Sequence, residues 1–317
     1  MNNSSLISVQ HLSRYYGKLA AVTDISFDLS PGEVLGFLGP NGAGKTTTMN
    51  MICGNLAPSH GSIHICGIDL MENAKQAKAH IGYLPETPPL YREFSVDEYL
   101  TYCAKINRLP REKITSAVDL AKQRCGLEQV GRRLINNLSK GYQQRVGLAQ
   151  AIIHSPSVIV LDEPTVGLDP IQIREIRQVI KALGKEHGVI LSTHILPEVL
   201  ITCDHVQIIA QGTLVFNDRL ENLQQNNPAE ATRIQFKRPP DIQTLQNISG
   251  VNNVESFDGG RFKLHHNIDT DISDSIISLA IEEDLGLTEL TPESKTLEQI
   301  FVDITSGDQS SDTENAA

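Results

Sequence analysis

The chain has 317 residues, of which 40% are hydrophobic and 21% charged, and its formal net charge at pH 7 is −11. This composition excludes wholesale disorder and fibrous repeats, and the acidic balance argues against general nucleic-acid binding, which needs clustered Lys and Arg. No apolar run approaches the ~20 residues of a membrane-spanning helix, and the N-terminus MNNSSLISVQ lacks the features of a secretory signal, so we expect a two-domain protein of the cytoplasm.

The N-terminal third predicts two kinds of sheet. Residues 1–30 alternate apolar and polar side chains, which indicates two or three short strands. The apolar run 34–38 leads directly into GPNGAGKTTT and predicts a buried strand, a loop and a helix. Further short strands are predicted at 62–66 and 81–84.

The middle of the chain predicts a helical insert over about 95–150. Ser95-Val-Asp-Glu fits a capping box at its start, and Pro110 is predicted to open a second helix.

Beyond the insert, apolar runs at 158–161 and 189–191 predict central parallel strands, the second following a helix stop at Gly188. The apolar residues between them recur at helical spacing. Strand, crossover helix and strand together indicate an α/β core.

The C-terminal part predicts a separate small domain. Polarity rises at 224–230, QQNNPAE, where a proline marks a linker. Strands and helices then follow in the order strand, helix, strand, strand, helix, strand, which matches a split-βαβ, ferredoxin-like unit. A last helix is predicted near 297–304. We therefore expect an N-terminal domain at 1–224, an accessory domain at 225–305 and a disordered acidic tail at 306–317.

A phosphate-binding loop is the strongest motif. Residues 39–46 satisfy GxxxxGK[ST] between a predicted strand and a predicted helix. The glycines allow backbone N–H groups to surround phosphates, and the helix N-terminus adds positive potential. Lys45 is expected to hold the β- and γ-phosphates and Thr46 to bind Mg²⁺. The predicted nucleotide-binding residues of the loop are Gly39, Pro40, Asn41, Gly42, Ala43, Gly44, Lys45, Thr46 and Thr47.

A second motif places two carboxylates at the end of a buried strand. The predicted strand 158–161 places Asp162 and Glu163 at its carboxyl end, on the edge of the sheet where α/β proteins bind ligands. Asp162 is predicted to hold Mg²⁺ through water, and Glu163 to act as the general base. Alone, such a pair is more typical of an exposed strand end; together with the phosphate loop it indicates catalysis.

The segment Leu138-Ser-Lys-Gly-Tyr-Gln-Gln-Arg145 resembles the LSGGQ signature of the ABC transporter ATPases. In that family the signature serine and glycine of one subunit contact the γ-phosphate held by the facing subunit. The resemblance therefore implies that Ser139 and Gly141 act in trans, in a homodimer or a pair with a related ATPase subunit. Ser139 also fits a helix N-cap. Lys140 and Tyr142 depart from the signature.

Other family elements occur in the expected order. Tyr16 resembles the aromatic residue that stacks on adenine, Asp169 of Gly-Leu-Asp resembles the loop that couples facing subunits, and His194 resembles the switch histidine at the γ-phosphate. Glu86 stands where the family has glutamine. It could still accept from Mg²⁺-bound water, and its charge predicts a sharper dependence on Mg²⁺.

The resemblance covers residues 5–220 and implies the fold and the activity. It implies a P-loop NTPase (RecA-like) core with an antiparallel β subdomain and a helical subdomain, beside the small α+β C-terminal domain. The implied activity is a Mg²⁺-dependent ATPase, with ATP and Mg²⁺ as cofactors, that drives separate transmembrane permease subunits from the cytoplasmic face of the membrane. Segment 87–93 occupies the position where relatives contact those subunits, and segment 295–304 resembles the tail of the subfamily that drives export.

Two other classes remain as alternatives. ABC-type ATPases that act on ribosomes or DNA typically carry two cassettes or a long coiled-coil insertion, whereas this sequence has one phosphate loop and no such insertion. A non-catalytic nucleotide sensor would not need Lys45, Asp162, Glu163 and His194 together.

Overall fold

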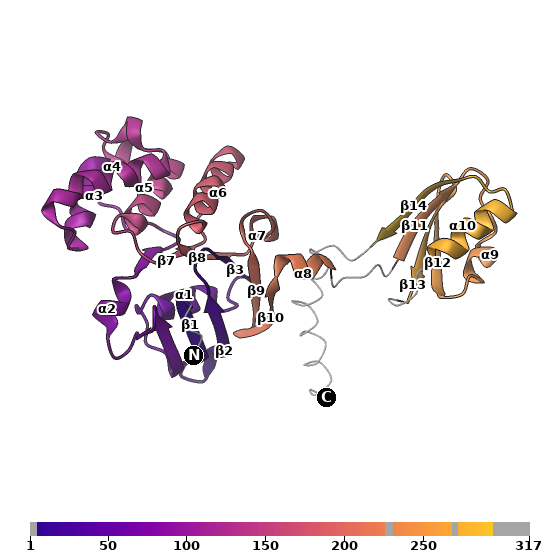
Figure 1. The fold of residues 1–317 in the computed structure, drawn as a ribbon, viewed down its shortest axis with the longest axis horizontal. Helices are drawn as coiled ribbons and strands as arrows, with labels where there is room; N and C mark the ends of the chain where they lie inside the picture. The colour runs from indigo at the N-terminus through magenta and orange to yellow at the C-terminus, as the bar shows by residue number, and fades with distance from the viewer. Residues whose placement is uncertain (1–4, 226–230, 268–271, 294–317) are drawn as a thin grey trace. The chain divides into compact units, whose positions relative to one another are not determined.

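The computed structural model describes residues 5–225, 231–267 and 272–293 (Figure 1). Contacts divide the chain into two compact units, Met1–Leu220 and Glu221–Ala317. The predicted linker 224–230 lies largely outside the described residues. The helix predicted near 297–304, the export-type segment 295–304 and the tail 306–317 lie entirely outside them.

The first unit contains an antiparallel sheet in the order β2-β1-β4-β5. The two or three short strands predicted at the N-terminus are in fact two long ones. Irregular register interrupts the pairing of these two strands between Val9 and Tyr15, and His11 has a φ of 52°. These bulges break the apolar alternation, which is why the sequence indicated shorter strands. The sheet consists of β1 (Ile7–Tyr16), β2 (Leu19–Leu29), β4 (His60–Ile65) and β5 (Ile68–Asp69).

The second sheet of this unit has the order β10-β9-β3-β8-β7-β6, in which only the edge strand β10 is antiparallel. All residues of β3, β7 and β8 are buried, as expected for central strands covered on both faces. Since β3, β8 and β7 are neighbours and parallel, their carboxyl ends meet at one edge. The strands are β3 (Val34–Leu38), β6 (Ile81–Leu84), β7 (Val158–Asp162), β8 (Gly188–Thr193), β9 (His205–Ala210) and β10 (Thr213–Arg219).

Gly188 is not the predicted helix stop. The crossover helix α6 (Pro170–Gly184) ends earlier, and Gly188 is the first residue of β8. A Cβ at this position would lie 2.8 Å from the Leu6 side chain and 2.9 Å from that of Leu29. Glycine is therefore required here by close packing rather than by a helix end.

The helical insert forms a compact group of α3, α4 and α5 (Figure 1). The Ser95 capping box is confirmed: the Ser95 hydroxyl accepts from Glu98 N–H and the Glu98 carboxylate accepts from Ser95 N–H. Pro110 does not open the second helix directly, because the 3₁₀ turn η1 (Arg111–Lys113) comes first. The remaining helices of this unit are α1 (Lys45–Ile52), α2 (Ala74–Lys78), α3 (Val96–Ile106), α4 (Ile114–Cys125), α5 (Lys140–Ile152) and α7 (Leu196–Thr202), with 3₁₀ turns η2 (Glu128–Val130) and η3 (Ile135–Asn137).

Helix α8 (Leu220–Gln225) follows β10. Among the described residues, no helix has both the length and the apolar character that crossing a bilayer would require.

Over the described residues 231–267 and 272–293, the second unit is an antiparallel sheet of order β12-β13-β11-β14 with two helices. Its elements follow in the β-α-β-β-α-β order of a split βαβ unit. Ile234, Phe262, Leu264 and Ile276 belong to its own hydrophobic core, which shares no residue with the core of the first unit. The elements are β11 (Ala231–Phe236), α9 (Ile242–Gln246), β12 (Val251–Phe257), β13 (Arg261–His266), α10 (Ser273–Glu282) and β14 (Leu287–Glu293).

Separate cores predict separate unfolding. Leu264 is completely buried, so Leu264→Ala should destabilise the second unit by about 2–5 kcal/mol and leave the melting of the first unit unchanged. Differential scanning calorimetry would measure both transitions. Ile281→Ala is the matched control, because Ile281 is 74% exposed and its truncation removes little buried surface. One shared transition that moves as a whole would contradict the prediction.

Candidate functional site

A cavity of about 370 Å³ lies where the carboxyl ends of β7 and β8 meet the start of α1. Its walls come from five segments of the first unit that are separated in sequence. They contribute Leu19, Ala20 and Ala21; Asn41, Gly42, Gly44, Lys45, Thr46 and Thr47; Glu86; Glu163 and Val166; and His194.

The glycine-rich loop can only form because its glycines lack side chains. Gly42 and Gly44 have φ values of 81° and 107°, in the left-handed region that favours glycine. A Cβ on Gly44 would lie 2.6 Å from the Ala21 carbonyl oxygen, and one on Gly39 would lie 2.3 Å from that of Ile209. Helix α1 starts directly after Gly44, so its unpaired N-terminal N–H groups lie at the cavity. Such a helix start attracts anions.

The Lys45 ammonium is held inside this loop. The side chain is only 6% exposed, and Nζ donates to the Gly39 carbonyl oxygen at 2.8 Å and to that of Pro40 at 3.2 Å. The same ammonium lies 3.5 Å from Oε1 of Glu163. It therefore connects the loop after β3 to the carboxylate after β7.

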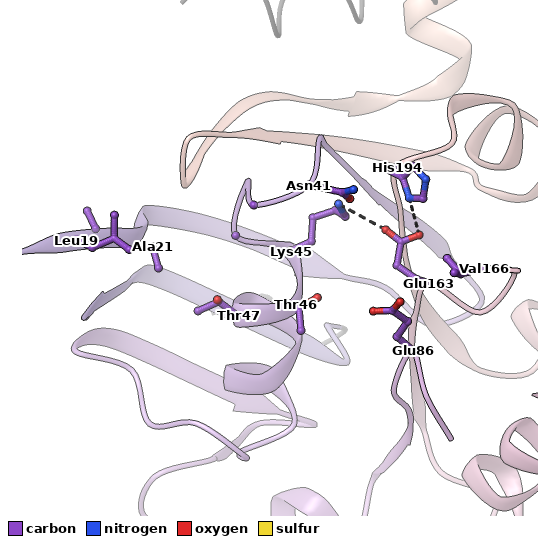
Figure 2. Close-up of a pocket in the computed structure, with 13 residues that line it drawn as sticks. Leu19, Ala21, Asn41, Lys45, Thr46, Thr47, Glu86, Glu163, Val166 and His194 are labelled. Carbon is purple, nitrogen blue, oxygen red and sulfur yellow. Dashed lines mark hydrogen bonds and ion pairs between the residues drawn. The ribbon is translucent and has the colours of Figure 1, made fainter. Parts of the chain in front are cut away.

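The Glu163 carboxylate lies between the side chains of Lys45 and His194. Figure 2 shows Lys45 and His194 pointing at opposite oxygens of its carboxylate, and His194 Nδ1 lies 2.9 Å from Oε2. The Glu163 backbone has a φ of 48°, a left-handed conformation that costs a non-glycine residue about 1–2 kcal/mol. Its N–H donates to the Ser192 carbonyl oxygen at 3.0 Å, which ties this conformation to β8.

Asp162 and Glu86 supply further carboxylate oxygens. Asp162 is 1% exposed, does not line the cavity, and its Oδ1 is buried without a hydrogen-bond partner. Burial raises the pKa of the Cys53 thiol, and the Asp162 carboxylate raises it further. Glu86 does line the cavity, together with Thr46. Within the described part of the chain, no group of three or more His, Cys, Asp or Glu could hold a metal ion by itself.

Several predicted site residues lie outside the cavity lining. Tyr16, at the end of β1, is 47% exposed, and the Arg14 guanidinium lies 4.8 Å above the centre of its ring. Gly39, Pro40 and Ala43 belong to the loop but do not line the cavity.

The signature residues lie at the start of α5. Ser139 caps this helix, as predicted, by accepting from the Tyr142 N–H. Gly141 is buried against Gln172, where a Cβ would lie 2.6 Å from the side-chain carbon Cδ. Asp169 caps α6 by accepting from the Gln172 N–H at 2.9 Å. Gln172 thus links the signature helix to the helix that follows Asp169, and neither Ser139, Gly141 nor Asp169 lines the cavity.

Four cavity-lining residues were not predicted from the sequence. Leu19, Ala20, Ala21 and Val166 carry no polar group, so no motif points to them. The only relevant signal is the position of β2 directly after the Gly17-Lys18 turn, next to Tyr16. Leu19, Ala20 and Ala21 lie at the cavity because β2 packs against the glycine loop, whereas Val166 belongs to the turn that follows Glu163.

Comparisons with known proteins show the family of this chain. The family model described as ABC transporter matches residues 22–166. An uncharacterized ABC transporter ATP-binding protein of Bacillus subtilis, YhcH, is 34% identical, with 95% of this chain and 96% of the relative covered. The bacitracin transport ATP-binding protein BcrA of Bacillus licheniformis is 30% identical over 96% of this chain and 98% of its own length.

A solved structure is similar as well. The structure of cbiO1 from Clostridium perfringens, part of the ABC transporter complex cbiONQ, superposes with a TM-score of 0.64 at 29% identity. It covers 70% of this chain and 91% of that one. The P-loop NTPase fold class is confirmed, and the full-length relatives support a transporter ATPase rather than an ATPase that acts on ribosomes or DNA. The glycine loop, the carboxylate pair and these relatives together show that the chain belongs to the ATP-binding proteins of ABC transporters.

Proposed function

We propose that this chain binds ATP with Mg²⁺ in the 370 Å³ cavity and hydrolyses it with Glu163 as the general base. The observation that carries the proposal is the position of the Glu163 carboxylate, 3.5 Å from the Lys45 ammonium and 2.9 Å from His194. Both neighbours hold the carboxylate at the mouth of a phosphate-binding loop.

The loop would hold the triphosphate. Its backbone N–H groups and the α1 N-terminus would receive the phosphate oxygens, and the Lys45 ammonium would contact the β- and γ-phosphates. Gly39, Pro40, Asn41, Gly42, Ala43, Thr46 and Thr47 would complete this enclosure. Tyr16 would stack on the adenine ring, with Arg14 supporting the other face of the tyrosine.

Mg²⁺ would fit between the loop and β7. The unpaired buried Oδ1 of Asp162 and the Thr46 hydroxyl are oxygen ligands of the kind Mg²⁺ prefers, and Mg²⁺ sites keep waters and substrate phosphates as further ligands. Thr46 would bind the metal directly and Asp162 would bind it through a water, so the site needs few direct protein ligands. Glu86, on the same cavity, would accept from a metal-bound water. Bound Mg²⁺ neutralises phosphate charge.

The chemical step would then use Glu163 and His194. Water attacks the γ-phosphorus, the bond to the bridging oxygen of ADP breaks, and the water proton passes to Glu163. His194, held by its hydrogen bond to Glu163, would contact the γ-phosphate.

A second copy would complete the site. Ser139 and Gly141 do not line the cavity of their own chain, and Ser139 caps the exposed start of α5. In a homodimer, or a pair with a related ATPase subunit, they would contact the γ-phosphate of the facing chain. Asp169 would couple the two subunits.

The ATPase would drive separate transmembrane subunits, and we propose export, at the cytoplasmic face of the membrane. The name of BcrA refers to bacitracin transport. Segment 87–93 would contact the permease. Tyr91 of this segment is 48% exposed and packs against Phe94 and Tyr102, with ring centres 5.6 and 5.4 Å apart. The second unit has no predicted nucleotide-binding residue, and we assign it a regulatory or dimerising role.

The first prediction concerns the base. Glu163→Gln should lower kcat about 100-fold or more while retaining ATP affinity, and it should dimerise stably with ATP. Steady-state hydrolysis and equilibrium nucleotide binding measure the two effects. Lys45→Ala should instead weaken ATP binding, because it removes the cation inside the loop. Glu112→Gln makes the same chemical change at an exposed position and should behave as wild type. Near-normal turnover by Glu163→Gln would show that Glu163 is not the general base.

A second prediction tests the composite site. Mixing Ser139→Arg chains with Lys45→Ala chains places both lesions in one site of the dimer and leaves the other site intact. Hydrolysis by the mixture should partly recover compared with either variant alone. A mixture as inactive as both parents would mean that the in-trans arrangement is wrong or that both sites must act together.

The third prediction concerns Glu86. Because this carboxylate adds a negative charge to the cavity beside Thr46, Glu86→Gln should keep measurable ATPase activity and shift the Mg²⁺ concentration that gives half-maximal rate. Mg²⁺ titrations of the two proteins at constant ATP would show the shift. Superimposable titrations would exclude a role for Glu86 near the metal.

A further inference from the structure

A second buried carboxylate lies behind the cavity. Glu198, on α7, is 1% exposed and does not line the cavity. Each of its oxygens receives a hydroxyl hydrogen bond: Thr165 Oγ1 donates to Oε1 at 2.5 Å and Thr193 Oγ1 donates to Oε2 at 2.9 Å. Both threonines are buried as well, at 3% and 0% exposed. The Thr165 bond has the short length that hydroxyl donors reach with a carboxylate acceptor.

The two threonines come from the two segments that carry the reacting groups. Thr165 is two residues after Glu163, and Thr193 directly precedes His194. Glu198 therefore joins the turn after β7 to the end of β8, two chain segments that share no helix or loop. The Thr193 hydroxyl also accepts from the Ile195 N–H at 3.1 Å, which fixes the backbone on the other side of His194.

The turn after β7 needs such a restraint. Glu163 has the left-handed φ of 48°, and a strained residue keeps its conformation only where the surroundings enforce it. On one side its N–H is bonded to the Ser192 carbonyl oxygen. On the other side the Thr165–Glu198 bond holds the chain two residues later. Thr165 also starts the turn to Asp169, since its carbonyl oxygen accepts from the Leu168 N–H at 3.2 Å.

Glu198 is itself held in place by a cation. The Arg177 guanidinium of α6 lies 3.5 Å from Oε1, and Arg177 is 20% exposed. The nearby guanidinium offsets the cost of burying the carboxyl group, and each carboxyl oxygen accepts one hydroxyl hydrogen bond. The network thus spans the turn after β7, the end of β8, α6 and α7.

We propose that Glu198 is a positioning residue for ATP hydrolysis: through Thr165 and Thr193 it fixes the relative position of Glu163 and His194. This inference rests on the proposed role of Glu163 as the base. Neither threonine lines the cavity. Loss of the network should therefore lower kcat and leave ATP binding unchanged, since among the described residues the hydrogen bonds of this network do not reach the phosphate loop.

The test uses single threonine variants of the full-length chain. Thr165→Val and Thr193→Val keep the shape of the side chain and remove the hydroxyl. Each should lower kcat about tenfold, because small misplacements of reacting groups are costly, with ATP affinity within about twofold of wild type. Thr165→Ser restores the hydroxyl and should restore most of the activity. Glu198→Gln should resemble the valine variants, since it cannot accept equally at both positions.

Thr202→Val is the matched control. Thr202 lies on the same helix as Glu198 and is 3% exposed, but its hydroxyl has no hydrogen-bond partner. Its replacement should leave kcat unchanged. Melting temperatures of all variants would separate a loss of position from a loss of fold.

A double variant links the effect to the base. In a Glu163→Gln background the residual rate no longer depends on the placement of a carboxylate, so adding Thr165→Val should cause no further loss. If Thr165→Val alone matches Thr202→Val, or if its effect persists unchanged in the Glu163→Gln background, the positioning role is wrong. If Glu163→Gln is itself fully active, the assignment of the base fails instead, so the two failures can be told apart.

Discussion

The site depends on one strained residue. Glu163 follows a fully buried strand in a left-handed backbone conformation, and its carboxylate lies between the Lys45 ammonium and the His194 ring. An extended backbone at this point would continue β7 and direct the side chain elsewhere. The glycine loop, the parallel sheet and the Glu198 network each supply one of the restraints that hold this conformation. Packing of the buried core around β3, β7 and β8 supplies the free energy that offsets the strain at Glu163.

The parallel sheet is what brings distant motifs together. The glycine loop follows β3, Glu163 follows β7 and His194 follows β8, and the sheet order places β8 between the other two strands. Parallel strands end at the same edge, so segments as far apart in sequence as Lys45 and Glu163 converge without any specific attraction between them. Hydrogen bonds and ion pairs then fix the side-chain positions within the arrangement that the sheet topology has set.

The starts of helices α5 and α6 are linked to each other. Helix α5 starts at Ser139 and α6 at Asp169, and Gln172 contacts both starts through the Gly141 backbone and the Asp169 carboxylate. Lys140 occupies a signature position where the family has glycine, and its ammonium lies within 2.1 Å of where a Gly167 side chain would begin. Gly167 has a φ of 72°, so its backbone conformation favours glycine, whereas the flexible end of Lys140 could move aside.

The sequence by itself determined the local chemistry and much of the secondary structure. The phosphate loop, the Asp162-Glu163 pair, the signature helix cap and the strands 34–38 and 81–84 follow from short-range patterns, in which residue type and spacing alone specify backbone geometry. The same local rules failed at the bulged strands β1 and β2, where irregular pairing interrupts the alternation, and at Gly188, where glycine serves packing against Leu6 and Leu29 rather than a helix end. Only the tertiary structure decided that Leu19, Ala21 and Val166 line the cavity and that Glu198 lies between Thr165 and Thr193. These residues belong to no recognisable sequence motif. Their positions depend on contacts between segments that are distant in sequence, and a local pattern does not encode such contacts.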